Sequence, residues 1–170
     1  MIGRRDAIRA GSLGGYGNIK TQAGYPKPDD PESTPMKVQG ACHCGQISFE
    51  AEIDPEAVRI CHCADCQQMS GSAYRVNVAA PAETFVLRSG APKTYLRTAD
   101  SGNERAHAFC ANCGTQIYAA APRDPPTYSI RVGTLKQRAE LVPKRQIWYR
   151  SALTWAADLR SIPQVERQSS

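Results

Sequence analysis

The chain has 170 residues, of which 21 are Lys or Arg and 16 are Asp or Glu, and its formal net charge at pH 7 is +5. This length suits one domain with a hydrophobic core. No apolar run approaches the roughly 20 residues that a membrane-spanning helix requires. The basic N-terminus is not followed by the apolar segment of a secretory signal. We therefore expect a cytoplasmic protein without a membrane partner.

The positive charge is weak evidence for nucleic-acid binding. Residues 36–170 contain 16 basic and 12 acidic residues, together with all seven cysteines. If these cysteines held two zinc ions as thiolates, the region would become nearly neutral. We therefore expect no nucleic-acid partner.

The beginning of the chain reads as a tail. It contains the stretches GSLGGYG and YPKPDDPESTP, which are rich in Gly, Pro and Ser and have almost no aliphatic periodicity. This composition predicts a disordered or extended segment over residues 1–35. A folded domain is expected over residues 36–165, followed by a short C-terminal tail over residues 166–170.

Most of the predicted domain has the pattern of short β-strands. Residues 46–53 place Ile47, Phe49, Ala51 and Ile53 on one face, with the period of two that is typical of a half-buried strand. Six further segments have similar β character: residues 73–79, 83–90, 93–98, 105–110, 115–121 and 127–135. The turn signal Ser-Gly-Ala-Pro separates the second of these six from the third, which predicts a hairpin.

Helix is scarce in this sequence. The best candidates are residues 64–70, ended by Gly71, and a short segment around residues 151–155. Many short strands interrupted by cysteine-rich loops predict a mainly β fold.

Cysteine is the most informative residue type in the chain. The seven cysteines form three groups: Cys42 and Cys44; Cys61, Cys63 and Cys66; Cys110 and Cys113. Their odd number argues against a disulfide framework, and clustered cysteines in a reducing compartment are more often metal ligands or redox thiols. A CxxC turn followed by Gly, as in the third group, lets two thiolates meet one metal with little strain.

The seven thiols divide naturally into a closed set of four and an open set of three. The CxC pair and the CxxC pair would complete a structural site, and the middle CxCxxC cluster would then hold a metal with three ligands. Other groupings stay open at this point. His43, His62 or His107 could complete a site, and two purely structural zinc sites are the main alternative.

Four stretches, GACHCG, CHCADCQQMSGSAY, FCANCGTQIY and RVGTL, resemble the glutathione-dependent formaldehyde-activating enzyme family, also called the GFA or CENP-V/GFA family. The resemblance covers about residues 38–160. It implies a compact β-tent fold with two zinc ions per chain and carbon–sulfur lyase activity on glutathione and formaldehyde. Carried over by motif, the structural zinc has the ligands Cys42, Cys44, Cys110 and Cys113, and the second, catalytic-type zinc has Cys61, Cys63 and Cys66.

The chemistry of three thiolates supports this interpretation independently. Such a donor set makes zinc a weak Lewis acid that is poorly suited to generate hydroxide. It favours another soft ligand, and the thiol of glutathione is a natural fourth one. We therefore predict a zinc-dependent synthase or lyase that forms S-hydroxymethylglutathione, a thiol–aldehyde adduct.

The other groups of the reaction are less defined by the sequence. Possible proton donors in or after the CxCxxC loop are His62, Asp65, Ser70 and Tyr74. The carboxylates of glutathione could be bound by Arg75, Arg131 or Arg150. For Arg131, which stands between Ile130 and Val132, a solvated strand face is the simpler expectation.

Two other functional classes compete with the enzyme. A zinc-stabilised binding module would recognise a partner or glutathione without turnover. A thiol or redox sensor would lose metal from the three-cysteine site on oxidation.

Overall fold

The computed structural model of the chain describes residues 34–99 and 102–168. These residues all belong to one unit, Pro31–Ser170. The predicted tail over residues 1–35 therefore lies, except for its last two residues, outside the described part. The boundaries of the domain at residues 36 and 165 stay predictions.

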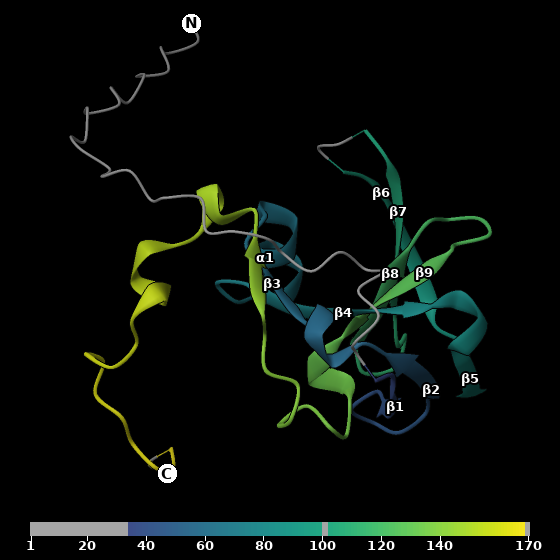
Figure 1. Cartoon of the computed structure of the whole chain (residues 1–170), viewed down its shortest axis with the longest axis horizontal. Coiled ribbons are helices and arrows are strands. Elements are labelled where there is room, and N and C mark those ends of the chain that lie inside the picture. The colour runs from purple at the N-terminus through teal and green to yellow at the C-terminus, as the bar shows by residue number, and fades with distance from the viewer. Residues whose placement is uncertain (1–33, 100–101, 169–170) are drawn as a thin grey trace, which may run out of the picture. The chain divides into compact units, whose positions relative to one another are not determined.

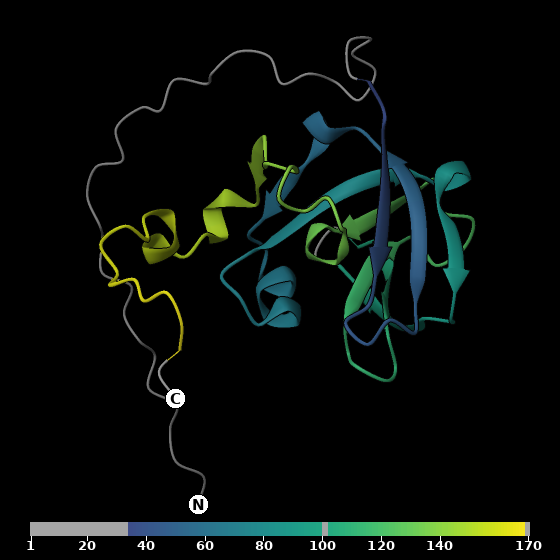
Figure 2. The same ribbon diagram turned by 90° about the horizontal axis from the view of Figure 1, so that it is seen from below.

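Two β-sheets make up the described part (Figures 1 and 2). The smaller sheet has the order β1-β2-β5, with β1 at Met36–Ala41, β2 at Ser48–Ile53 and β5 at Val86–Ser89. The larger sheet has the order β10-β3-β4-β9-β8-β7-β6. Its strands are β10 (Arg145–Ile147), β3 (Arg59–Cys61), β4 (Arg75–Pro81), β9 (Thr127–Arg131), β8 (Gln116–Ala120), β7 (Glu104–Phe109) and β6 (Lys93–Thr98).

Helices are short, and most of them are 3₁₀ turns. The α-helix α1 spans Ala64–Ser70 and ends at Gly71, whose φ of 61° is the left-handed conformation that glycine adopts easily. The 3₁₀ turns are η1 (Pro55–Ala57), η2 (Ala82–Thr84), η3 (Val132–Thr134), η4 (Tyr149–Ser151) and η5 (Thr154–Ala157). Both views show α1 beside β3 and β4 and away from β1 and β2 (Figures 1 and 2).

The prediction of a mainly β fold is confirmed. Each of the seven predicted strand segments overlaps an observed strand, and α1 has the predicted bounds. Around residues 151–155 the structure has 3₁₀ turns. Strands β3 and β10 were not predicted, because three residues are too few to show a periodic pattern. The six-residue strand β1 was not predicted either.

The predicted hairpin between residues 83–90 and 93–98 is wrong. Strand β5 pairs with β2, whereas β6 pairs with β7 in the other sheet. Ser89 holds β5 to the start of β2, because its hydroxyl donates to the carbonyl oxygen of Gln46 at 3.2 Å. Gly90, with φ of 72°, then redirects the chain into the larger sheet. The Ser-Gly-Ala-Pro sequence therefore predicted correctly that the chain changes direction here. It did not predict which strands β5 and β6 pair with.

The hydrophobic core lies between the two sheets. On β2 the predicted alternation is confirmed, since Ile47, Phe49, Ala51 and Ile53 are all buried. The larger sheet contributes Val78, Ala80, Ile117 and Ile130 to the same cluster. Four aromatic rings extend it: Phe49 stacks on Phe85, Phe85 on Tyr128, and Tyr118 meets both Phe85 and Tyr128 edge-on.

Gly40 on β1 is expected to tolerate no side chain. It stands directly opposite Phe49 on β2, and a Cβ at this position would overlap the Phe49 ring. Because that ring is buried and stacked, it has no free space to enter. We expect Gly40→Ala to lower the free energy of unfolding by about 1–3 kcal/mol, the usual cost of overpacking a core.

Chemical denaturation of the metal-loaded protein measures this effect. Gly133→Ala is the matched control, because Gly133 has no heavy atom within 4 Å of its Cβ position and no positive φ. Equal unfolding free energies of the two variants would show that the Phe49 ring can move away at little cost.

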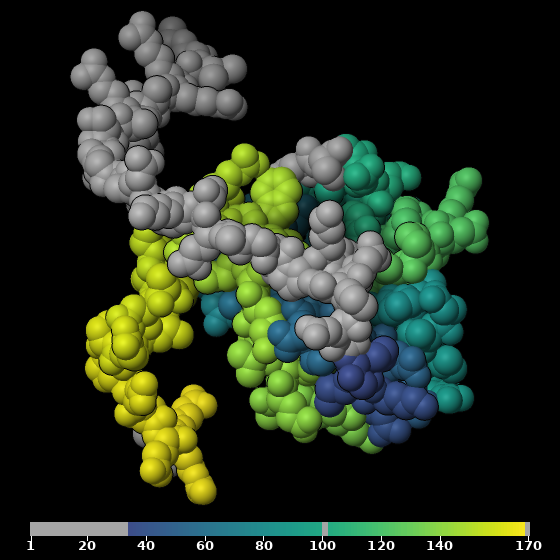
Figure 3. All heavy atoms as spheres, in the orientation of Figure 1, coloured from purple at the N-terminus to yellow at the C-terminus, as the bar shows by residue number. Residues whose placement is uncertain are grey.

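The chain leaves the two sheets after β10 and carries several apolar side chains outside the core. Exposed residues of this segment are Leu153, Trp155, Leu159, Ile162 and Val165. Figure 3 shows the segment (yellow) along the outside of the folded unit. Among the residues that the structure describes, no helix has both the length and the apolar character to cross a membrane.

Candidate metal centres

Two turns of similar geometry bring four cysteines together. Cys42 and Cys44 follow β1, and Cys110 and Cys113 stand between β7 and β8. In each turn the N–H of a glycine with positive φ donates to the carbonyl oxygen of the first cysteine, from Gly45 at 3.0 Å and from Gly114 at 2.9 Å. The four Sγ atoms lie within 4.8 Å of one another. The four-cysteine cluster, as we call this set, therefore links a loop of the smaller sheet to a loop of the larger one.

Hydrogen bonds favour the thiolate form of Cys44 and Cys113 in the four-cysteine cluster, whereas the pKa of Cys110 is raised to about 11 by burial and by its neighbours Cys113 and Cys42. The N–H of Ile47 donates to Cys42 Sγ at 3.2 Å. The hydroxyl of Thr115, 3.2 Å from Cys113 Sγ, and backbone N–H groups lower the pKa of Cys113 to about 5. A hydrogen bond from the Asn112 side chain lowers the pKa of Cys44.

The remaining cysteines form a three-cysteine cluster at the start of α1. Cys61 is the last residue of β3, Cys63 is the N-cap of α1, and Cys66 lies in its first turn. The N–H of Cys66 donates to Cys63 Sγ at 3.4 Å, so the helix end itself orients this sulfur. The three Sγ atoms also lie within 4.8 Å of one another. Hydrogen bonds from Cys66 and Cys63 lower the pKa of Cys61 to about 5, whereas the neighbouring Cys61 raises the pKa of Cys66.

The spacing of the sulfur atoms fits a metal in both clusters. Cys42 and Cys44 are 3.5 Å apart, Cys44 and Cys110 3.8 Å, and Cys61 and Cys63 3.5 Å. Four sulfurs arranged tetrahedrally at about 2.3 Å from a zinc ion would be about 3.8 Å apart. Each cluster could therefore hold a metal ion, and a donor set made only of sulfur suits a soft one.

The histidines that sequence analysis considered as ligands join neither cluster. His62 is only 4% exposed, its Nε2 lies 2.7 Å from Gln146 Oε1, and its ring meets Tyr74 and Tyr149 edge-on. His107 lies on β7 with its Nδ1 3.2 Å from Arg131 Nη2. In residues 34–99 and 102–168 no His, Cys, Asp or Glu makes the three-cysteine cluster a set of four.

A cavity of about 580 Å³ opens beside the three-cysteine cluster. Its lining includes Cys63, Asp65, Arg105 and Trp148. Trp148 has φ of 56°, an unusual value for a large residue, and such conformations concentrate at functional sites. Within the three-cysteine cluster, Cys63 is the residue that lines this cavity.

The proton-donor candidates have different surroundings. Asp65 lines the cavity but forms an ion pair with Arg97 at 2.7 Å. The hydroxyl of Ser70 donates to the carbonyl oxygen of Cys66 at 2.6 Å, a hydrogen bond within α1. Tyr74 packs against the His62 ring. Of the candidates His62, Asp65, Ser70 and Tyr74, Asp65 is the one in the cavity lining.

Two of the three arginines from the sequence analysis are buried in the larger sheet. Arg75 is 6% exposed and Arg131 is 7% exposed. The expectation of a solvated strand face for Arg131 is therefore wrong, because the face that it shares with Asn77 is covered. Arg150 instead stacks on Trp148, with its guanidinium carbon 4.9 Å from the ring centroid.

Arg131 is held in place by neutral partners. Its Nη1 donates to Asn77 Oδ1 at 2.6 Å, and its Nη2 lies 3.2 Å from His107 Nδ1. Burial and the charges of Arg131 and Arg75 lower the pKa of His107 to about 4, so the ring is neutral at pH 7 and Nδ1 accepts from Arg131. Burial, with the charge of Arg75, lowers the pKa of Arg131 to about 9, which leaves it charged at pH 7. Sequence analysis found no signal for this group, because its members come from three separate strands.

Comparison with known proteins found a similar solved structure and a family match. A crystal structure of a Rhodobacter sphaeroides protein is similar, with a TM-score of 0.50 and 22% sequence identity over 64% of this chain and 98% of that one. This likeness concerns the fold alone. Residues 37–151, which include all seven cysteines, match the family described as glutathione-dependent formaldehyde-activating enzyme, GFA. The chain therefore belongs to the GFA family.

Proposed function

We propose that this protein is a zinc-dependent carbon–sulfur synthase or lyase that interconverts glutathione plus formaldehyde with S-hydroxymethylglutathione in the cytoplasm. The observation that carries the proposal is the three-cysteine cluster, whose Cys63 faces a cavity and which no other His, Cys, Asp or Glu of the described residues joins. Family membership supports the same substrates.

In this proposal Cys61, Cys63 and Cys66 hold one zinc ion, and Cys42, Cys44, Cys110 and Cys113 hold another. A bound zinc at the three-cysteine cluster would supply a coordination position for a thiol and lower the pKa of that thiol. The cavity at Cys63 gives a thiol access to this position. The four-cysteine cluster has no vacant position and would serve the fold.

The buried charges favour an anionic fourth ligand. Three thiolates and one Zn²⁺ have one net negative charge, while Arg75 and Arg131 bring two positive charges into the same buried face of the larger sheet. Addition of one thiolate would balance them. A neutral water or imidazole would leave an uncompensated buried positive charge, which is costly.

In this reaction the main task of the protein is to place the thiol sulfur next to the carbonyl carbon of the aldehyde. The thiolate sulfur forms the new bond to the carbonyl carbon, and the electron pair of the C=O bond moves to oxygen, which then takes a proton. Asp65 is an acceptor in its ion pair with Arg97, so we assign the final proton to water in the cavity. The reverse sequence breaks the carbon–sulfur bond and gives the lyase activity.

Cobalt(II) substitution tests the proposal. The protein should bind two cobalt ions per chain, and glutathione should change the visible and thiolate-to-metal bands of one of them in a saturable way. The Cys63→Ser variant should lose this response. Two cobalt sites that both ignore glutathione would mean that the chain supplies every ligand itself, and the enzyme proposal would fail.

A further inference from the structure

Arg75 is a buried cation beside the three-cysteine cluster. It stands on β4 directly opposite Cys61 on β3, and directly opposite residues of paired strands project from the same face of a sheet. Burial lowers the pKa of Arg75, and negative charge on Cys66, Cys63 or Cys61 raises it, so these sulfurs lie close enough to affect the guanidinium. The Arg75 side chain therefore lies on the same face of the larger sheet as Cys61 of the three-cysteine cluster.

The terminal donors of Arg75 are not used, whereas Arg131 lacks a partner only at its buried Nε among the described residues. Arg131 donates from Nη1 to Asn77 and from Nη2 to His107. Both terminal nitrogens of Arg75, Nη1 and Nη2, are buried and donate to no acceptor among the described residues. A buried guanidinium without acceptors costs free energy, because it has given up its hydrogen bonds to water. Such a group is consistent with a ligand that supplies the acceptor.

The surroundings restrict the chemistry of that ligand. Asp65, the carboxylate that acts on Arg75, already pairs with Arg97 at 2.7 Å. The sulfurs of the cluster are expected to face their metal. The planar guanidinium fork presents two parallel donors, which match the oxygens of an oxyanion better than any other small acceptor.

We propose that Arg75 forms an oxyanion site next to the three-cysteine cluster. The site takes a negatively charged oxygen of a molecule whose sulfur occupies the fourth metal position, and in this respect it rests on the proposed function. The oxygen has two possible sources. It belongs either to a carboxylate of the thiol ligand, or to the alkoxide that forms when the sulfur attacks the aldehyde and the C=O electron pair moves to oxygen.

Two thiols that differ by one carboxylate distinguish these sources. Mercaptoacetate and 2-mercaptoethanol are titrated into the cobalt-loaded full chain, as the wild type and as Arg75→Met and Arg75→Lys. With a carboxylate site, Arg75→Met weakens mercaptoacetate binding by about tenfold or more and leaves 2-mercaptoethanol unchanged, in line with the strength of a charged hydrogen bond. With an alkoxide site, binding of both thiols is unchanged, and the rate of adduct formation from 2-mercaptoethanol and formaldehyde falls by about tenfold or more.

The Arg75→Lys variant distinguishes the effect of the two parallel guanidinium donors from the effect of the positive charge. Lys keeps the positive charge but loses the two parallel donors, so it should recover only part of the effect. If Arg75→Met weakens both thiols equally and Arg75→Lys restores them fully, Arg75 merely balances the charge of the thiolates, and the oxyanion site is refuted. Unchanged binding and rate in Arg75→Met would refute it as well.

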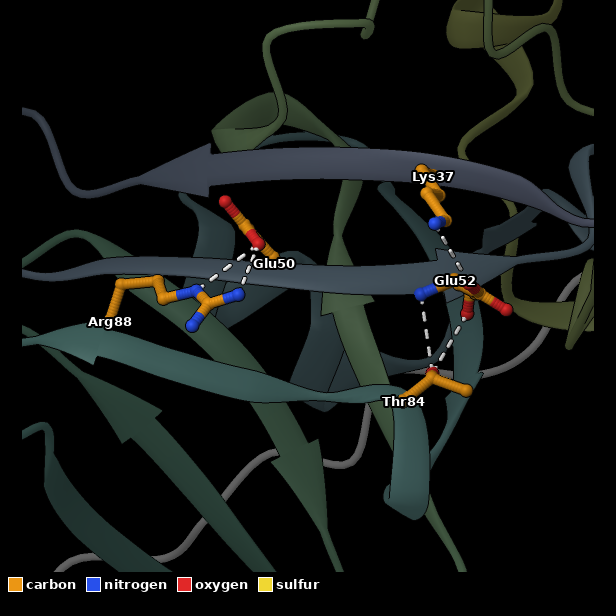
Figure 4. Close-up of polar contacts among 5 residues, drawn as sticks. All are labelled: Lys37, Glu50, Glu52, Thr84 and Arg88. Atoms are coloured by element: carbon orange, nitrogen blue, oxygen red, sulfur yellow. Dashed lines mark hydrogen bonds and ion pairs between the residues drawn. The ribbon is translucent and has the colours of Figure 1, made fainter.

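Arg88→Met is the matched control. Arg88 lies on β5 in the smaller sheet, where its Nη2 is 2.7 Å from Glu50 Oε2. Figure 4 shows this pair and the pair of Lys37 with Glu52 at different points along β2. The substitution removes the same side chain from a position outside the larger sheet. It should alter neither thiol affinity nor rate, and metal content and circular dichroism verify that every variant is folded.

A separate arm uses acetate alone. Saturation-transfer NMR should detect acetate binding to the wild type and to Arg88→Met but not to Arg75→Met, if the site accepts carboxylates. If the wild type binds acetate in this way but its cobalt spectrum ignores both thiols, the oxyanion site stands and the proposed function fails. If the thiols bind and neither acetate nor turnover depends on Arg75, the proposed function stands and the oxyanion site fails.

Discussion

Substitution of Cys110 by serine is expected to destabilise the whole domain, with a fall in the melting temperature of roughly 10–20 °C, as a loss of several kcal/mol implies for a domain of this size. Cys110 is 1% exposed and belongs both to the hydrophobic core and to the four-cysteine cluster. The cluster joins the loop after β1 to the loop between β7 and β8. In such sites the free energy of metal binding contributes directly to folding.

Thermal unfolding and metal analysis test this prediction together. The Cys110→Ser protein should contain no more than one metal per chain, and addition of a chelator to the wild type should lower its melting temperature in the same way. A variant that lost one metal but melted like the wild type would show that the core alone holds the two sheets together.

Substitution of Cys63 by serine is expected to abolish activity and to preserve the fold. Cys63 is a ligand candidate that faces the cavity, so its loss should release the metal of the three-cysteine cluster. It is also the N-cap of α1, where its sulfur accepts the N–H of Cys66. Serine is among the best N-cap residues, so the helix should survive the change.

The measurement is the rate of adduct formation from glutathione and formaldehyde above the uncatalysed rate, which requires a protein-free blank in each series. We expect the catalysed part to fall by about a hundredfold or more, because metal-ion catalysis supplies several kcal/mol of barrier lowering. The melting temperature should stay within about 5 °C of the wild type, as for a surface substitution. Retained activity in a folded variant that has lost one metal would separate turnover from the three-cysteine cluster.

The contrast between Cys110→Ser and Cys63→Ser depends on location. Both substitutions replace one sulfur by oxygen. One affects a cluster between two sheets, and the other affects a cluster within one short segment, Cys61 to Cys66. A result in which both variants unfold, or both stay folded, would contradict the assignment of structural and catalytic-type roles.

Local features of the chain were predictable from the sequence because they depend on neighbouring residues. The alternation on β2, the bounds of α1 and its end at Gly71 follow from side-chain periodicity and backbone freedom within a few residues. The two sets of cysteines also agree with their spacing, since a CxC or CxxC turn fixes the distance between its own sulfurs. The family resemblance that these motifs suggested agrees with the GFA family match over residues 37–151.

Pairings between distant segments were decided only by the tertiary structure. The turn at Gly90 could join β5 to β6 in a hairpin, but β5 pairs with β2 and β6 pairs with β7. The buried residues Arg75, Asn77 and Arg131, together with the half-buried His107, come from β4, β7 and β9, and no periodicity marks them. From the sequence alone, a polar residue in a strand is predicted to face solvent. That prediction can be corrected only when the element that covers its face is known. The sequence motifs therefore predicted the family, the mainly β class and, through the family resemblance, the two cysteine sets, while the three-dimensional packing decided that Arg75 lies opposite Cys61 in a buried part of the larger sheet.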